Sequence, residues 1–163
     1  MSTSSLLDLE NQICFAVYSA SLTITKAYQP LLKALELTYP QYLVMLVLWQ
    51  TDGRSVSEIG QNLFLDSGTL TPMLKRMESL GLIERRRSTE DERQVNVHLT
   101  PKGRSLRKRA ATVPEDLLCA SGCSVSELKS LNTSLRKIRE NLAKSELLDR
   151  QTSKGTQPKG KKT

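Results

Sequence analysis

Residues 55–100 have the sequence SVSEIGQNLFLDSGTLTPMLKRMESLGLIERRRSTEDERQVNVHLT, and this stretch decides the fold. It opens with Ser55 and Glu58 at the spacing of a capping box, in which two side chains satisfy backbone N–H groups of a first helical turn. The next apolar residues recur at helical spacing: Ile59, Leu63 and Phe64. The pattern therefore predicts a short amphipathic helix at the start of the stretch.

A second helix is predicted to follow, with Asp66 or Ser67 as its N-cap. Its apolar stripe consists of Leu70, Leu74, Met77 and Leu80. Its other positions carry mostly hydroxyl and basic side chains: Thr69, Thr71, Pro72, Lys75 and Arg76. Gly81 is the residue type at which helices often stop, so we expect this helix to end there.

Two strands are predicted after this helix. Residues 83–87 form the first strand, and Val95, Val97 and Leu99 alternate at period two in the second. Residues 88–93 between them are too polar to be buried. Two short helices followed by a β-hairpin have the order of a winged helix-turn-helix, which binds duplex DNA. The expected fold class is therefore mainly α with a small β-hairpin wing.

Positive charge is concentrated in the same part of the chain. Residues 75–109 carry eleven Lys and Arg against five Asp and Glu, whereas residues 1–74 carry three against six. A basic patch favours a polyanion, because phosphate contacts release counterions. A solvated surface on an ordinary basic protein would have the same charge, but the position on a helix-turn-helix and wing favours double-stranded DNA.

Length and composition predict one domain with a tail. With 163 residues, 38% of them hydrophobic and 25% charged, the chain has an adequate core for its size. We expect a cytoplasmic protein that does not enter a membrane, because we find neither a long apolar run nor a signal-peptide pattern. Thiols are kept reduced there, so its three cysteines are expected to be free or redox-active rather than a structural disulfide framework. Residues 149–163 are basic and contain no hydrophobic residue, so we expect a disordered tail.

Amphipathic helices are predicted on both sides of residues 55–100. Before this segment, apolar residues keep helical spacing from Leu6 to Leu35, over about eight turns with a bend near Pro30. Residues 40–50 form a further, very apolar helix. We assign residues 1–54 to N-terminal dimerisation helices that also form a sensing pocket.

The C-terminal flank, residues 101–148, is assigned to a second set of dimerisation helices. Thr100 and Pro101 are predicted to open a helix that runs to about Ala111 and is interrupted near Pro114. A second capping box then opens a helix whose stripe is Leu128, Leu131, Leu135, Ile138 and Leu142. Such stripes favour a homodimer, which would place two recognition helices about one DNA turn apart. The alternative is that the stripes cover the domain's own core.

Three motifs resemble those of a known family: Leu80-Gly81-Leu82-Ile83, Asp91-Glu92-Arg93-Gln94-Val95-Asn96-Val97 and Leu99-Thr100-Pro101-Lys102-Gly103. From about residue 7 to residue 143 the chain resembles the multiple-antibiotic-resistance regulators, the MarR family. The resemblance implies a homodimeric, mostly helical repressor that leaves a palindromic operator when a ligand or an oxidant acts on it.

The same resemblance implies which residues contact DNA. Those expected in the major groove and on phosphates are Ser67, Thr69, Thr71, Pro72, Lys75 and Arg76. Arg93, Arg86 or Arg87 would enter the minor groove from the wing, with Asp91 orienting the arginine. Arginine suits a narrow minor groove because of its negative potential, but the residue pattern leaves open which arginine reaches it.

Cys14 is the candidate sensor. Within the family its context resembles that of the organic-hydroperoxide-resistance regulators, in which a reactive cysteine is accompanied by two tyrosines, here Tyr28 and Tyr39. A thiolate is the nucleophile that attacks a peroxide, and phenol hydroxyls can donate hydrogen bonds to it. The alternative for a lone helical cysteine is an inert, small apolar residue.

Cys119 is the candidate resolving thiol, because its placement resembles the two-cysteine branch of these regulators. There a sulfenic acid on the first cysteine forms a disulfide with a cysteine of the other subunit. The role of Cys123 stays open. Two thiols without a nearby histidine do not complete a zinc site, and His98 is expected on the wing surface, so we predict no metal and no cofactor.

Two other functions fit parts of the pattern. A regulator of the same fold could respond to a lipophilic or phenolic ligand, with cysteines that sense nothing. A thiol peroxidase that used Cys14 and Cys119 would explain the sulfur chemistry but would leave the wing without a role. We find no paired carboxylates, phosphate-binding glycine loop or Ser/His/Asp set, so we do not expect an enzyme.

Overall fold

The structure is a computed structural model that describes residues 7–88, 91 and 93–145. It divides the chain into two compact units, residues 1–117 and residues 118–163. The predicted tail at residues 149–163 lies outside the described residues. Among the helices that the structure describes, none is long and apolar enough to cross a membrane.

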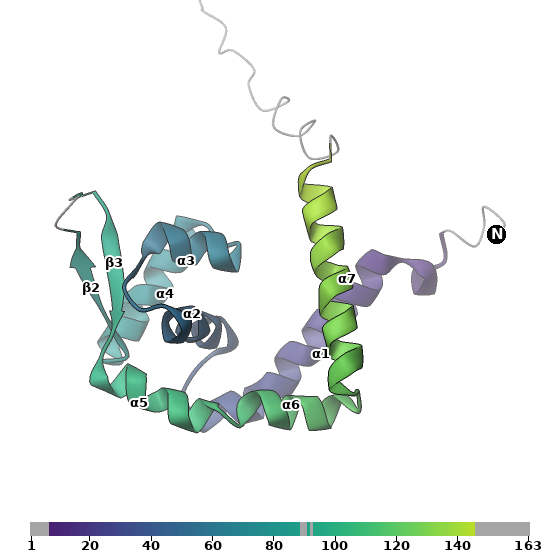
Figure 1. The fold of residues 1–163 in the computed structure, drawn as a ribbon, viewed down its shortest axis with the longest axis horizontal. Helices are drawn as coiled ribbons and strands as arrows, with labels where there is room; N and C mark the ends of the chain where they lie inside the picture. Colours follow the sequence, from purple (N-terminus) through teal and green to yellow (C-terminus); the bar gives the residue numbers. More distant parts are fainter. Residues whose placement is uncertain (1–6, 89–90, 92, 146–163) are drawn as a thin grey trace, which may run out of the picture. The chain divides into compact units, whose positions relative to one another are not determined.

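The first unit is a winged helix-turn-helix with further helices on both sides (Figure 1). Its elements are η2 (Leu9–Asn11), α1 (Ile13–Lys33), α2 (Tyr39–Gln50), β1 (Arg54–Ser55), α3 (Val56–Leu63), α4 (Ser67–Ser79), β2 (Ile83–Arg87), β3 (Val95–Leu99) and α5 (Pro101–Ala110). The helix α6 (Val113–Ser121) continues into the second unit, which also contains α7 (Val125–Ala143). The predicted fold class is confirmed.

The wing is an antiparallel sheet in the order β1-β3-β2. Ile83 of β2 lies opposite Leu99 of β3, and Arg87 lies opposite Val95. The two strands match the predicted ranges. The third strand, β1, pairs Arg54 with Val97 and was not predicted, because two residues are too few to show a period-two pattern.

Both predicted capping boxes form. The Glu58 backbone N–H donates to Ser55 Oγ at 3.2 Å, and the Ser55 N–H donates to a carboxylate oxygen of Glu58 at 2.8 Å. The same reciprocal pair opens α7, where the Ser124 N–H donates to Glu127 at 2.8 Å. Asp66, not Ser67, is the N-cap of α4.

The long N-terminal helix begins later than predicted. Gln12 has an extended backbone at φ −86° and ψ 113°, and residues 9–11 form a separate 3₁₀ turn. The expected continuous helix from Leu6 was therefore wrong. A spacing of three residues places side chains on one side in a 3₁₀ turn as well as in an α-helix, so the apolar periodicity does not distinguish them.

Two residues predicted on apolar helix faces lie outside the core. Phe64 is the C-cap of α3 and is 70% exposed, whereas Ile59 on the same helix is fully buried. Leu80 is the C-cap of α4 and is also exposed. In both cases the helix ends before the residue, so the 3.6-residue period no longer determines the direction in which its side chain points.

The core connects α4, the sheet, α2 and α5. Its fully buried side chains include Met45, Leu48, Ile59, Leu70, Leu74, Met77, Ile83 and Val97. The buried indole N–H of Trp49 donates to the Gly103 carbonyl oxygen at 3.0 Å. A Cβ atom at Gly103 would lie 2.1 Å from the Leu82 carbonyl oxygen, so only glycine lets α5 approach the chain this closely.

Both α1 and α7 carry exposed apolar residues within their own units, whereas the C-terminal end of α1 joins the core through Leu32. On α1 the exposed apolar residues include Ile13, Val17, Tyr18, Leu22 and Ile24. On α7 they are Val125, Leu131, Leu135, Ile138 and Leu142, and no residue of α7 is buried. The predicted amphipathic character of both helices is therefore visible in the structure, with apolar side chains at the surface.

Candidate DNA interface and cysteine sites

The polar face of α4 points to solvent as the sequence predicts. Five of the six expected contact residues are exposed and one, Thr71, is half-buried; the exposed residues are Ser67, Thr69, Pro72, Lys75 and Arg76. The opposite face is held in place by Leu70, Leu74 and Met77, which are fully buried. The helix is therefore fixed on the core with hydroxyl and basic groups facing outward.

Asp66 organises the first turn of α4. One carboxylate oxygen accepts the Thr69 backbone N–H at 2.9 Å, and the other accepts the Thr69 hydroxyl at 2.9 Å. The backbone and hydroxyl hydrogen bonds from Thr69 hold the pKa of Asp66 below its usual value. Because the Thr69 hydroxyl donates to Asp66, its remaining role toward DNA is that of an acceptor.

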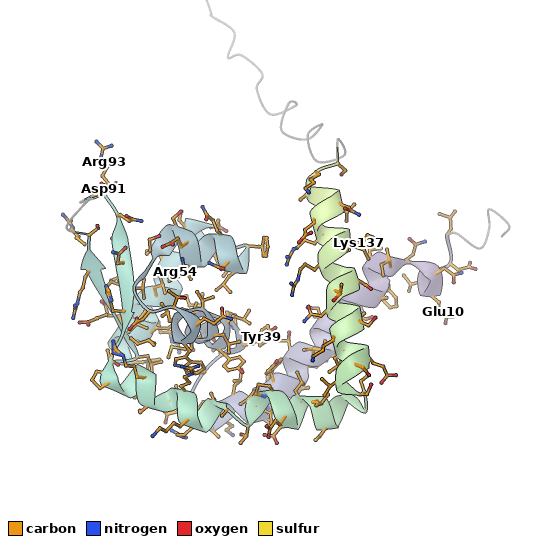
Figure 2. All side chains as sticks on the ribbon, in the orientation of Figure 1. Glu10, Tyr39, Arg54, Asp91, Arg93 and Lys137 are labelled. Atoms are coloured by element: carbon orange, nitrogen blue, oxygen red, sulfur yellow. The ribbon has the colours of Figure 1, made fainter. Side chains whose placement is uncertain are left out.

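An open groove of about 1050 Å³ lies between α3, α4 and the wing. Its polar lining includes Ser57, Gln61, Ser67, Thr71, Asp91 and Arg93. In Figure 2, Asp91 and Arg93 lie at the tip of the hairpin, away from the helices. A groove between a recognition helix and a wing is the place for the sugar–phosphate strand that separates a major groove from the adjacent minor groove.

The wing arginines differ in what they contact. Arg86 forms an ion pair with Glu84 on its own strand, and Arg85 forms one with Glu78 of α4 at 2.7 Å. Arg86, Arg87 and Arg93 are all exposed, and Arg93 projects from the tip. Of the arginines expected at the minor groove, Arg86 is thus engaged in an ion pair and Arg93 lies at the hairpin tip.

Asp91 shapes the turn that carries Arg93. Its carboxylate accepts the Arg93 backbone N–H at 3.0 Å, and its carbonyl oxygen accepts the Gln94 N–H at 2.9 Å. Asp91 thus positions the main chain of Arg93 in an Asx-type turn.

Two ion pairs that hold the wing were not predicted. Glu78 accepts both the backbone N–H of Arg85 at 2.9 Å and its guanidinium, and this guanidinium holds the pKa of Glu78 below its usual value. Asp52 accepts the Leu99 N–H at 2.8 Å and the Arg104 guanidinium at 2.8 Å. The two partners of each pair lie on different segments, so the period of a single helix or strand could not reveal them.

Cys14 is exposed at the second position of α1. Tyr28 lies fourteen residues further along the same helix, which corresponds to roughly 21 Å at the rise of an α-helix. Cys14 therefore cannot contact Tyr28 of its own chain.

The two predicted tyrosines do lie together. The ring centroids of Tyr28 and Tyr39 are 4.8 Å apart, and the Tyr42 ring lies 5.8 Å from that of Tyr28. Burial, followed by the proximity of Tyr39 and Tyr42, raises the pKa of Tyr28 to about 12. Its hydroxyl stays protonated at neutral pH and remains a hydrogen-bond donor.

Cys119 and Cys123 belong to the second unit and are both exposed free thiols. Cys119 lies near the end of α6, where its carbonyl oxygen accepts the Gly122 N–H at 3.3 Å. Cys123 follows Gly122, whose φ is +66°. Within residues 7–88, 91 and 93–145, no group of three or more His, Cys, Asp and Glu side chains is arranged to hold a metal ion.

Comparisons with known proteins identify the class of protein. The family model of the transcriptional regulator SarA/Rot matches residues 26–109. The organic hydroperoxide resistance transcriptional regulator of Bacillus subtilis (strain 168) is 49% identical over 136 residues, which cover 83% of this chain and 92% of that protein. Both are transcriptional regulators rather than enzymes.

Solved structures agree with this class. Reduced AbfR bound to DNA is 36% identical with a TM-score of 0.68 and covers 84% of this chain and 96% of its own. AbfR, a protein of Staphylococcus epidermidis, is also solved in a disulfide form, with a TM-score of 0.59 at 36% identity, 83% coverage of this chain and 95% of its own. MarR from E. coli, 24% identical over 78% of this chain and 96% of its own, has a TM-score of 0.65 and shows the shared fold.

Proposed function

Because the chain belongs to the MarR family of transcriptional regulators, we propose that it is a redox-sensing repressor. In the reduced state it binds a palindromic operator as a homodimer. An organic hydroperoxide oxidises Cys14, a disulfide with Cys119 of the partner subunit follows, and the dimer leaves the DNA. The observation that carries this proposal is the groove between α4 and the wing, with a hydroxyl-rich helix on one side and Arg93 on the other.

DNA binding follows from the two sides of that groove. The exposed face of α4 supplies Lys75 and Arg76 together with hydroxyl groups, which suits the major groove. The wing tip reaches the neighbouring minor groove with Arg93. The strand between the two grooves occupies the open space, where Ser67 and Thr71 donate to its phosphates.

The homodimer is supported by the exposed apolar residues of α1 and α7. Together, the apolar residues on these two long helices expose more apolar surface to solvent than a monomer normally does. Two-fold pairing through them would present two α4 helices to successive major grooves of one operator.

The sensing chemistry begins at Cys14. Its thiolate sulfur attacks the distal peroxide oxygen, the O–O bond breaks, and the alkoxide takes up a proton and leaves as an alcohol. The sulfenic acid then condenses with the Cys119 thiol, which forms the S–S bond and releases water. Since Tyr28 of the same chain is too far away, the hydrogen bonds to the Cys14 thiolate would come from Tyr28 and Tyr39 of the partner subunit.

The relatives support this reading. The similar Bacillus subtilis protein is named for organic hydroperoxide resistance, and AbfR is solved both reduced on DNA and with a disulfide. A disulfide requires Cα atoms within roughly 7 Å, so its formation would constrain the helices that carry the two α4 copies. Loss of their spacing would end simultaneous binding of both half-sites.

The test uses the full-length reduced protein and a duplex that it selects from a random-sequence library. Cumene hydroperoxide, added to about one equivalent per sensor thiol, should release the DNA and produce a Cys14–Cys119 peptide on mass spectrometry. Cys14→Ser should stay bound under the same treatment. Cys119→Ser should give a sulfenic acid that dimedone traps, without a crosslinked dimer. Release of the Cys14→Ser protein by the peroxide would contradict the proposal.

A second candidate function rests on a separate cavity. A cleft of about 440 Å³ between α2, α5 and the start of α6 is lined by Tyr42, Leu46, Trp49, Leu63, Arg107 and Ala110. Apolar walls with one cation fit a small phenolic or aromatic acid. Under this alternative a phenolic ligand would release the Cys14→Ser protein from DNA in excess dithiothreitol.

A further inference from the structure

Phe64 has a backbone conformation that its side chain does not favour. It lies between α3 and α4 with φ 56° and ψ 38°, in the left-handed region. The Leu65 N–H donates back to the Gly60 carbonyl oxygen at 3.0 Å, which closes the end of α3. Helices that end in this way usually place glycine or asparagine at the left-handed position, because a Cβ atom there is strained.

The ring of Phe64 does not contribute to the core. It is 70% exposed, and the core of this region is formed by Ile59 and Leu70, which are fully buried. A large apolar side chain at a strained and exposed position contributes little to stability. A strained residue at the surface is a reason to look for a function.

The position of Phe64 points to DNA. Its side chain lines the groove between α3, α4 and the wing, together with Ser67, Thr71 and Arg93. The turn packs closely on α3, because a Cβ atom at Gly60 would lie 2.8 Å from the Leu65 carbonyl oxygen. The groove therefore presents hydroxyl groups, a cation and an apolar ring in one space.

We propose that Phe64 contacts DNA directly and that its ring packs on the apolar surface of the strand in this groove. That surface is offered by deoxyribose carbons or by a thymine methyl group. A DNA strand carries charged phosphates and apolar surface side by side, which matches the mixed lining. The inference rests on the proposed DNA-binding function and adds a DNA-contacting residue to it.

The test compares Phe64→Gly with a matched variant, Glu36→Gly. Glu36 also has φ 56°, but it lies between α1 and α2, outside the groove lining. Both substitutions relieve the same backbone strain, so both should raise the melting temperature by a few degrees. Only Phe64→Gly should weaken binding to the duplex that the unsubstituted protein selects from a random-sequence library.

The expected loss is measurable. Removing a contact that shields about 40 Å² of ring surface lowers affinity about fivefold per subunit, and about 25-fold for a dimer that uses both copies. The slope of log affinity against log salt should not change, because no phosphate contact is lost. Phe64→Ala, which keeps the strain and removes the ring, should show the same loss of affinity.

A duplex with uracil in place of thymine identifies which apolar surface the ring contacts. If the contact is to thymine methyl groups, the uracil duplex binds the unsubstituted protein more weakly but binds Phe64→Gly with unchanged affinity. If the contact is to deoxyribose, uracil changes the affinity of neither protein. Equal affinity of Phe64→Gly and Glu36→Gly, or a lower melting temperature for Phe64→Gly alone, would overturn this inference. Failure of the unsubstituted protein to select any duplex would overturn DNA binding itself.

Discussion

Replacing Arg93 by glutamine should change the salt dependence of DNA binding. The proposed interface uses three exposed cations of each subunit: Lys75, Arg76 and Arg93. If the positive charge of each residue releases the counterion of about one phosphate, about six charges per dimer give a slope of log affinity against log salt of roughly −5. Arg93→Gln removes two of these charges per dimer, so the slope should become shallower by about 1.8.

The matched control is Arg86→Gln. Its guanidinium is bound to Glu84 on the same strand, so removing it should change the slope little. Fluorescence anisotropy with the selected duplex over a range of potassium chloride concentrations measures both slopes. An unchanged slope for Arg93→Gln together with a shallower slope for Arg86→Gln would refute the assignment of the minor-groove residue.

Two further predictions concern stability. Gly103→Ala should lower the free energy of unfolding, measured in urea, by about 2–5 kcal/mol. The added Cβ atom would collide with the Leu82 carbonyl oxygen, and the resulting shift would break the buried hydrogen bond from Trp49 to Gly103. Gly81→Ala is the control: it has open space around it and should cost only about 1 kcal/mol. The Ser55 backbone N–H, followed by the Arg54 side chain, lowers the pKa of Glu58 to about 2. The stability that this group contributes is therefore present above its unfolded pKa near 4.5 and is lost as pH falls toward 2. In a plot of melting temperature against pH, Glu58→Gln should therefore make the fall on the acid side less steep. A steeper fall would contradict the capping role.

Local chemistry made much of the fold predictable. Capping boxes, the apolar stripe of α4 and the alternation in β3 each follow from hydrogen bonding or burial within a few residues. The exposed face of α4 was predictable for the same reason, since residues off the buried stripe must face solvent.

Errors occurred where a helix ends. Phe64 was placed on an apolar face, but α3 stops one residue earlier and the left-handed turn directs the ring outward. The sequence pattern also left open which wing arginine is available, since this depends on the ion pairs of Arg85 with Glu78 and of Arg86 with Glu84.

By itself, the sequence determined the order of elements, their amphipathic faces and the basic character of residues 75–109, because these depend on neighbours along the chain. Only the tertiary structure decided which side chains share a space. It placed Phe64 and Arg93 in one groove and put Tyr28 beside Tyr39 but out of reach of Cys14 in the same chain. These relations depend on packing between segments distant in sequence, for which the periodicity of one helix or strand carries no information.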